Sequence, residues 1–117
     1  MIPANWEEHR RSDDDALLGY LVGGADSVVP VTVFGYPLAD GVPYFEAEQI
    51  LDDAALGYLA DPWFLQFDEV WQRVRISDVS PDLVVVTLDD DRFDEDFGTR
   101  FELPVPVDAR LRHRRPD

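Results

Sequence analysis

Alternation of apolar and polar residues dominates the second half of the chain. Residues 70–79 repeat with a period of two: valine and isoleucine fall on one face, while Trp71, Arg73 and Arg75 fall on the other. This period is typical of a half-buried strand. The aromatic run at residues 63–67 is a shorter strand that precedes it.

Two further strands follow. Residues 80–82, Ser-Pro-Asp, indicate a turn, and the continuously apolar residues 83–88 are typical of a strand in the centre of a sheet. Residues 100–107 alternate again, with phenylalanine, leucine and valine pointing inward. Pro104 and Pro106 occupy the opposite face, where they protect a sheet edge against pairing with other chains.

The first half of the chain predicts a hairpin. Residues 16–22 are apolar, and the Ser-Asp-Asp-Asp sequence at residues 12–15 before them also fits the start of a capped helix. We prefer a strand because Gly19 interrupts the run and because the β-rich residues 28–34 follow two glycines. Pro30 places the second strand near a sheet edge.

One helix is expected between the two halves. Apolar residues recur there at spacings of three and four, which defines one helical face: Ala47, Ile50, Leu51, Ala54 and Tyr58. Pro43 suits the start of this helix, and Gly57 suits the position just past its end.

These elements predict an α+β fold. We expect a small, strongly bent antiparallel sheet or a partly open SH3-like barrel of about six strands with one helix. The domain boundaries that follow are an N-terminal arm at 1–12, a single domain at 13–107 and an Arg-rich tail at 108–117.

Charge changes this picture more than any motif. The 117 residues include 25 acids and 10 arginines, with no Lys or Cys, and carry a net charge of -15. The tail from residue 110 onward is positive, with four arginines against one acid. Such an acidic surface repels nucleic acid and anionic membrane and favours a homo-oligomer or a basic protein partner.

Several functions and locations are disfavoured. Without Cys there is neither a disulfide nor thiolate chemistry. The first residues do not resemble a signal peptide, and no apolar run is long enough to cross a membrane, so we expect a soluble cytoplasmic protein. No motif for a nucleophile or a phosphate-binding loop is present, which favours a non-enzymatic protein without a cofactor.

Several segments together resemble a group of small proteins of unassigned function from high-GC Gram-positive bacteria. These segments are residues 18–22, 29–32, 71–76, 79–82 and 102–104. The resemblance covers most of the chain, but it rests on structural residues. It therefore implies no activity.

Few residues are candidates for direct chemistry. The acidic loop at 89–98 is dense in carboxylates, and Asp91 and Asp94 are its best candidate ligands for a hard cation. Its spacing differs from that of an EF-hand, so a solvated loop is the simpler interpretation. His9 lies beside two glutamates on the predicted arm, where no pocket would orient it, and His113 lies in the tail. We interpret both as polar surface residues.

Candidate interaction residues fall into two groups. Trp71, Arg73 and Arg75 share one face of a strand, and four arginines lie in the tail: Arg110, Arg112, Arg114 and Arg115. Both groups suit contact with a protein partner, although the strand arginines also suit neutralisation of nearby acids.

Three hypotheses for function remain. The first is a non-enzymatic interaction or self-associating module, favoured by the absent catalytic constellation and the two oppositely charged regions. The second is a small ligand-binding protein or enzyme that uses a crevice between helix and sheet with Trp63, Trp71 and Arg73. The third is a mimic of nucleic acid, which the scattered placement of the acids disfavours.

Overall fold

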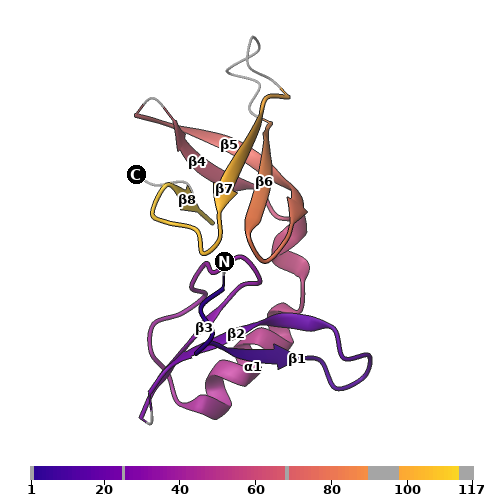
Figure 1. Cartoon of the computed structure of the whole chain (residues 1–117), viewed down its shortest axis with the longest axis vertical. Helices are drawn as coiled ribbons and strands as arrows, with labels where there is room; N and C mark the ends of the chain where they lie inside the picture. The colour runs from indigo at the N-terminus through magenta and orange to yellow at the C-terminus, as the bar shows by residue number, and fades with distance from the viewer. Residues whose placement is uncertain (1, 25, 68, 90–97, 114–117) are drawn as a thin grey trace.

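Two antiparallel sheets and one α-helix build the molecule, in a computed structural model that describes residues 2–24, 26–67, 69–89 and 98–113. Figure 1 shows two lobes. The helix lobe, drawn at the bottom, holds β1, β2, β3 and α1. The barrel lobe, drawn at the top, holds strands β4 to β8, which curl into a half-barrel. The predicted α+β fold with a bent antiparallel sheet is confirmed, with eight strands in the described ranges in place of about six.

The helix lobe forms around a hairpin. β2 (Leu17–Gly23) pairs with β3 (Val28–Val31), so the predicted hairpin is present, although the second strand ends at Val31 and not at residue 34. A glycine is required within β2, because a Cβ atom on Gly19 would lie 2.2 Å from the carbonyl oxygen of Val31. The hairpin and α1 bury a small aliphatic core: Leu18, Leu21, Val28, Ala47 and Leu51.

Part of the predicted N-terminal arm is in fact a third strand of this sheet. β1 (Glu7–Arg10) pairs antiparallel with β2 at the edge of this sheet. Its residues are polar, so the sequence carries no alternation that would signal a strand. Its backbone groups instead pair with a neighbour that hydrophobic burial already holds in place.

The helix is shorter than its apolar spacing predicted. α1 (Tyr44–Ala54) begins after Pro43 and ends where Ala55 adopts a positive φ of 49°. Tyr58 belongs instead to a separate 3-10 helix, η1 (Gly57–Ala60). The apolar spacing continues to Tyr58 because both segments face the interior, although the backbone changes direction between them.

The barrel lobe follows the predicted strands closely. β4 (Trp63–Phe67), β5 (Val70–Val79) and β6 (Leu83–Leu88) have the expected bounds, and β7 covers Arg100–Pro104, which is shorter than the predicted 100–107. The strand order is β7-β6-β5-β4-β8. The concave side holds the larger core, which includes Trp63, Val74, Val84, Val86 and Leu88.

The chain after residue 107 also departs from the prediction of a polar tail. β8 (Leu111–Arg112) pairs with β4, and Leu111 is only 1% exposed within the larger core. One apolar residue among arginines signals little by itself. The half-barrel nevertheless presents both an open strand edge and an apolar pocket to it. A domain boundary at residue 107 therefore cuts through packed structure.

The two lobes are joined by buried side chains. Phe34, in the turn after β3, is fully buried in the larger core and contacts the rings of Tyr58 and Trp63 edge-on. The Tyr58 hydroxyl donates to the carbonyl oxygen of Leu18 at 2.9 Å and accepts the Val33 N–H at 3.1 Å. Burial raises the pKa of Tyr58 to about 12.

Candidate functional site

The convex face of the barrel sheet collects the arginines that the sequence had placed in separate groups. In an antiparallel ladder, residues directly opposite each other share a face. Phe64 of β4 is opposite Arg73 of β5 on one side and opposite Arg112 of β8 on the other. Arg73 and Arg112 therefore lie on the same face, about 10 Å apart across two strand spacings.

A second row extends this face toward the opposite edge of the sheet. Arg75 of β5 is opposite Thr87 of β6, which is opposite Arg100 of β7. Trp71 lies on the same face, since alternate residues of β5 point the same way. We call this set of residues the arginine face: Trp71, Arg73, Arg75, Arg100 and Arg112.

Local contacts hold part of the arginine face in place. The guanidinium carbon of Arg112 lies 5.9 Å from the centroid of the Trp71 ring, within the range of a cation–π interaction. Arg73 Nε donates to the backbone carbonyl of Asp89 at 2.8 Å. Beside Arg100 the surface is hollowed by a cavity of about 350 Å³ that Val85 and Glu102 also line.

Arginines elsewhere in the described structure are paired with acids. Arg10 contacts Glu8 at 3.1 Å, Arg11 contacts Asp14 at 2.8 Å, and the Arg110 side chain contacts Asp108. The hydrogen bond from Arg11 holds the pKa of Asp14 down at about 2. Among the described residues, Arg75, Arg100 and Arg112 form no ion pair with a carboxylate. Their charge is thus available to an outside group.

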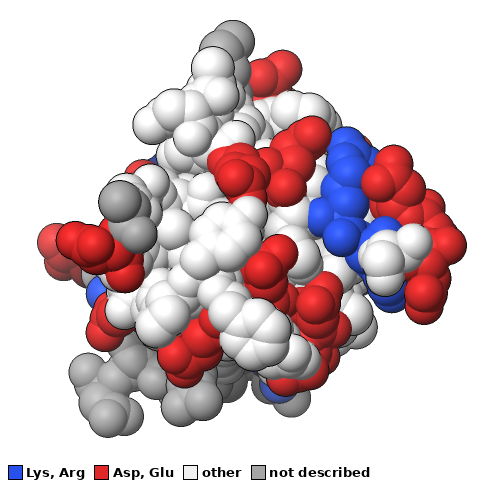
Figure 2. All heavy atoms as spheres, turned by 90° about the horizontal axis from the view of Figure 1, so that it is seen from below, with Lys and Arg blue, Asp and Glu red and all other residues white. Residues whose placement is uncertain are grey.

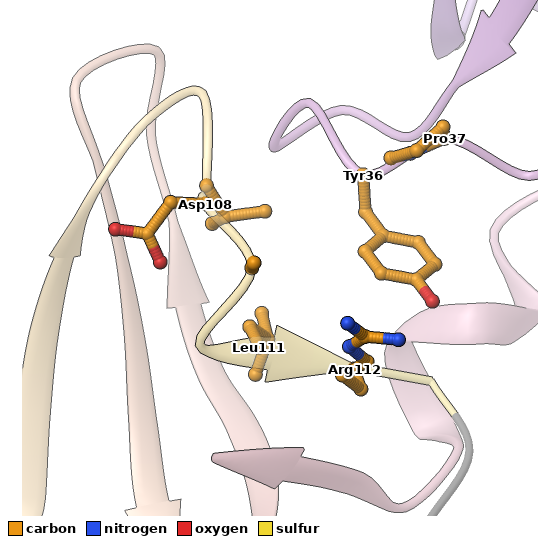
Figure 3. A pocket seen from close by; sticks show the side chains of 7 residues that line it. Tyr36, Pro37, Asp108, Leu111 and Arg112 are labelled. Carbon is orange, nitrogen blue, oxygen red and sulfur yellow. The ribbon is translucent and has the colours of Figure 1, made fainter. Parts of the chain in front are cut away.

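A second hollow, of about 310 Å³, separates the loop after β3 from the chain between β7 and β8. Figure 3 shows the Tyr36 ring and the Arg112 side chain on its walls, with the Asp108 carboxylate pointing away from Tyr36. The backbone N–H of Arg110 lowers the pKa of Asp108. Arg112 thus belongs to the arginine face and also lines this hollow.

His113 is packed against the barrel, contrary to its interpretation as a polar tail residue. Its ring stacks on Trp63 at a centroid distance of 4.4 Å, and its Nε2 lies 2.8 Å from an Asp61 carboxylate oxygen. Its backbone N–H donates to the Tyr36 hydroxyl at 3.3 Å. This arrangement fixes the end of β8 to the body of the protein, because Trp63 is fully buried.

His9 is also held by the fold and not on a flexible arm. Its Nε2 lies 2.8 Å from Asp52 and its Nδ1 lies 3.8 Å from Glu48, both on α1. The glutamates adjacent in sequence are not its partners. The neighbouring pair, the Tyr44 hydroxyl and the Glu7 carboxylate, joins the same two elements and raises the pKa of Tyr44 to about 12. His9 thus lies in a polar seam between β1 and α1.

The prediction of a crevice that combines Trp63, Trp71 and Arg73 is wrong. Trp63 lies on the concave side of the sheet and is fully buried, whereas the other two belong to the arginine face. A different groove, of about 240 Å³, lies at the junction of the lobes. Its lining is mainly apolar and includes Leu17, Leu56, Leu59 and Val79.

Four of the predicted site residues lie outside the described part of the chain: Asp91, Asp94, Arg114 and Arg115. The cation site in the acidic loop therefore stays a prediction. Within the described ranges, no three His, Asp or Glu side chains gather in a way that would hold a metal ion.

Sequence reasoning missed Arg100 as a member of the arginine face. The signal for its orientation was present, because alternation from Arg100 to Val107 puts it opposite the inward Phe101. What was missing was the register of β7 on β6 and of β6 on β5, which brings Arg100 into one row with Arg75.

Comparisons with protein-family profiles, curated proteins and solved structures found no match. The resemblance to proteins of high-GC Gram-positive bacteria therefore stays a prediction. In the part of the chain that the structure describes, no helix combines the length and apolarity needed to cross a membrane.

Proposed function

We propose that this protein is a non-enzymatic interaction module that binds an acidic segment of a protein partner through the arginine face. The observation that carries the proposal is the contrast between arginines: Arg75, Arg100 and Arg112 form no ion pair with a described carboxylate, whereas Arg10, Arg11 and Arg110 pair with local carboxylates. Arg112 also lies over the Trp71 ring of the same face. Trp and Arg are the residues most enriched at the energetic centres of protein interfaces.

The charge of the whole protein limits which anion fits. Duplex nucleic acid carries one charge about every 1.7 Å and would extend beyond the patch onto a surface of strongly negative charge. A short acidic peptide contacts the patch alone. At physiological ionic strength the Debye length is about 8 Å, so local attraction outweighs the more distant repulsion.

A peptide titration tests the proposal. We expect a labelled peptide of Glu and Asp with one Phe to bind the wild-type protein, measured by fluorescence anisotropy. Arg75→Gln should weaken binding about fivefold, because it removes one charge from the contact. Arg10→Gln is the matched control, since it removes the same charge from the other lobe, and binding should change less than about twofold. Equal losses in both variants would contradict a defined site.

Binding of a small apolar ligand is a second candidate function, favoured by the groove at the lobe junction. Its apolar walls match the usual lining of ligand sites. An apolar fluorescent dye should then bind with a stoichiometry of one, and Val79→Asp should abolish that signal without affecting the acidic peptide. Dye binding that survives this substitution would exclude the groove.

A further inference from the structure

Helix α1 presents a surface of opposite character to the arginine face. Phe45 is 77% exposed and Tyr44 is 46% exposed, an unusual exposure for large aromatic side chains. Helical spacing places polar and acidic side chains around Phe45 on the outward side: Glu46, Glu48, Gln49, Asp52 and Asp53. We call Phe45 and these five residues the acidic helix face.

Part of the acidic helix face is tied into the fold, and part is not. Asp52 contacts His9, and Gln49 donates to Asp53 at 2.9 Å. Glu46 is exposed, and no described cation contacts it. Figure 2 views the molecule from the helix-lobe end and shows acidic side chains spread over that end, with the largest group of arginine side chains at one margin.

We infer that the acidic helix face of one molecule docks on the arginine face of a second copy of this chain. This rests on the proposed function, because it names the partner of the same arginine face. Phe45 would pack against Trp71 and the apolar stem of Arg112, while Glu46 and Asp53 approach the guanidinium groups of the arginine face. Aromatic and Arg side chains that meet at the centre of a contact are typical of interface hot spots.

Charge excludes a contact between two like faces. Two arginine faces brought together would oppose cations to cations, and two acidic helix faces would oppose carboxylates to carboxylates. Only the contact between unlike faces is complementary. The two faces belong to different lobes of one molecule (Figure 1), so each molecule has one of each to offer. When one pair of unlike faces meets, the contact is heterologous and adds copies head to tail.

Salt should affect this association in two directions. At very low ionic strength the net charge of -15 on each copy repels the other over long distances. At high ionic strength the local attraction between the faces is screened as well. Association should therefore be strongest at intermediate salt.

Complementing variants test the inference by sedimentation velocity. Wild type should form species larger than a monomer at a few hundred micromolar protein, the range of a small and weak interface. Phe45→Ser removes one face and Arg75→Glu removes the other, so each variant alone should associate at least tenfold more weakly. An equimolar mixture should form a one-to-one dimer and no larger species, because each variant retains one intact face.

Two matched controls separate a specific contact from general effects. Arg10→Glu changes the net charge by the same amount as Arg75→Glu, and Val70→Ser removes a different exposed apolar side chain, one that is 43% exposed. Both should associate like wild type. If circular dichroism shows that a test variant is unfolded, Glu46→Lys and Arg100→Glu replace the pair.

Three results would overturn the inference: a monomeric wild type at every salt concentration, equal losses in Arg10→Glu and Arg75→Glu, or no dimer in the mixture. A monomeric wild type that still binds the acidic peptide through Arg75 would leave the proposed function standing. Loss of both activities would overturn both proposals.

Discussion

The helix lobe and the barrel lobe use their arginines and their apolar residues differently. In the helix lobe, Arg10 and Arg11 are paired with carboxylates of the same hairpin. In the barrel lobe, Arg75, Arg100 and Arg112 lie on the convex sheet face and form no ion pair with a described carboxylate. Arg10 and Arg11 thus neutralise acids of their own hairpin, whereas the charges of Arg75, Arg100 and Arg112 are not paired with a described carboxylate.

The two lobes also differ in the size and the residue types of their hydrophobic cores. The core cluster of the helix lobe consists of five aliphatic side chains among the described residues, and the barrel lobe has a larger cluster that contains Trp63, Tyr58 and Phe34. Phe34 comes from the chain of the helix lobe but packs in the barrel lobe. A small core of this kind gains much of its stability from contact with the larger one. The comparison therefore predicts that the lobes unfold together.

The largest expected effect comes from Phe34→Ala. This side chain is fully buried, and its truncation should cost about 3–5 kcal/mol of stability through lost burial and a residual cavity. Urea unfolding followed by far-ultraviolet circular dichroism and by tryptophan fluorescence should give one common transition at lower urea. Two separate transitions would show that the lobes unfold independently, which would contradict the prediction that they unfold together.

A somewhat smaller loss is expected for Leu111→Ala, which tests whether β8 belongs to the barrel lobe. Leu111 is buried beneath the half-barrel, so we expect a loss of about 2–4 kcal/mol in urea denaturation. Arg110→Ala is the matched control, because its side chain is exposed and contacts only Asp108 among the described residues. Its stability should change by less than about 0.5 kcal/mol. Equal effects would support the predicted domain boundary at residue 107, with residues 108–117 outside the domain.

Tyr58→Phe should have the next largest effect, at the junction of the lobes. Removing the hydroxyl leaves the Leu18 carbonyl and the Val33 N–H without their partner, at a cost of about 1–3 kcal/mol.

The pH dependence sharpens this test. The folded-state pKa of Tyr58 is about 12, above the usual 10 of an unfolded tyrosine, so its contribution is complete below pH 10 and is lost between pH 10 and 12. Tyr58→Phe should lose less stability across that range than wild type. Tyr44 also has a raised pKa, so Tyr44→Phe measures how much of the alkaline slope comes from an exposed tyrosine remote from the junction. An identical alkaline slope in wild type and Tyr58→Phe would show that the junction hydroxyl is not responsible.

Added salt should produce the smallest change. Net charge of this size opposes compaction, and ions screen the repulsion, so the melting temperature should rise by a few degrees between low and moderate NaCl. Differential scanning calorimetry at several concentrations measures this rise. A flat series would mean that local pairing of the kind seen at Arg11 and Asp14 already relieves the acidic surface throughout.

Strands with their own hydrophobic pattern were predictable from the sequence alone. β4, β5 and β6 have the expected bounds because each alternates or buries its residues independently of its neighbours, and the turn at residues 80–82 separates two of them. The start of α1 after Pro43 was predictable for a similar local reason. Local pattern also placed Trp71, Arg73 and Arg75 on one face.

Tertiary structure alone decided the rest. β1 and β8 are strands because neighbouring strands offer them backbone partners, and a polar or two-residue segment carries no periodic signal of its own. Arg100 and Arg112 join the arginine face through the register of strands distant in sequence. Alternation determines which way a side chain points from its own strand. Which residue lies beside it is determined by pairing across the sheet, and pairing depends on how the whole core packs.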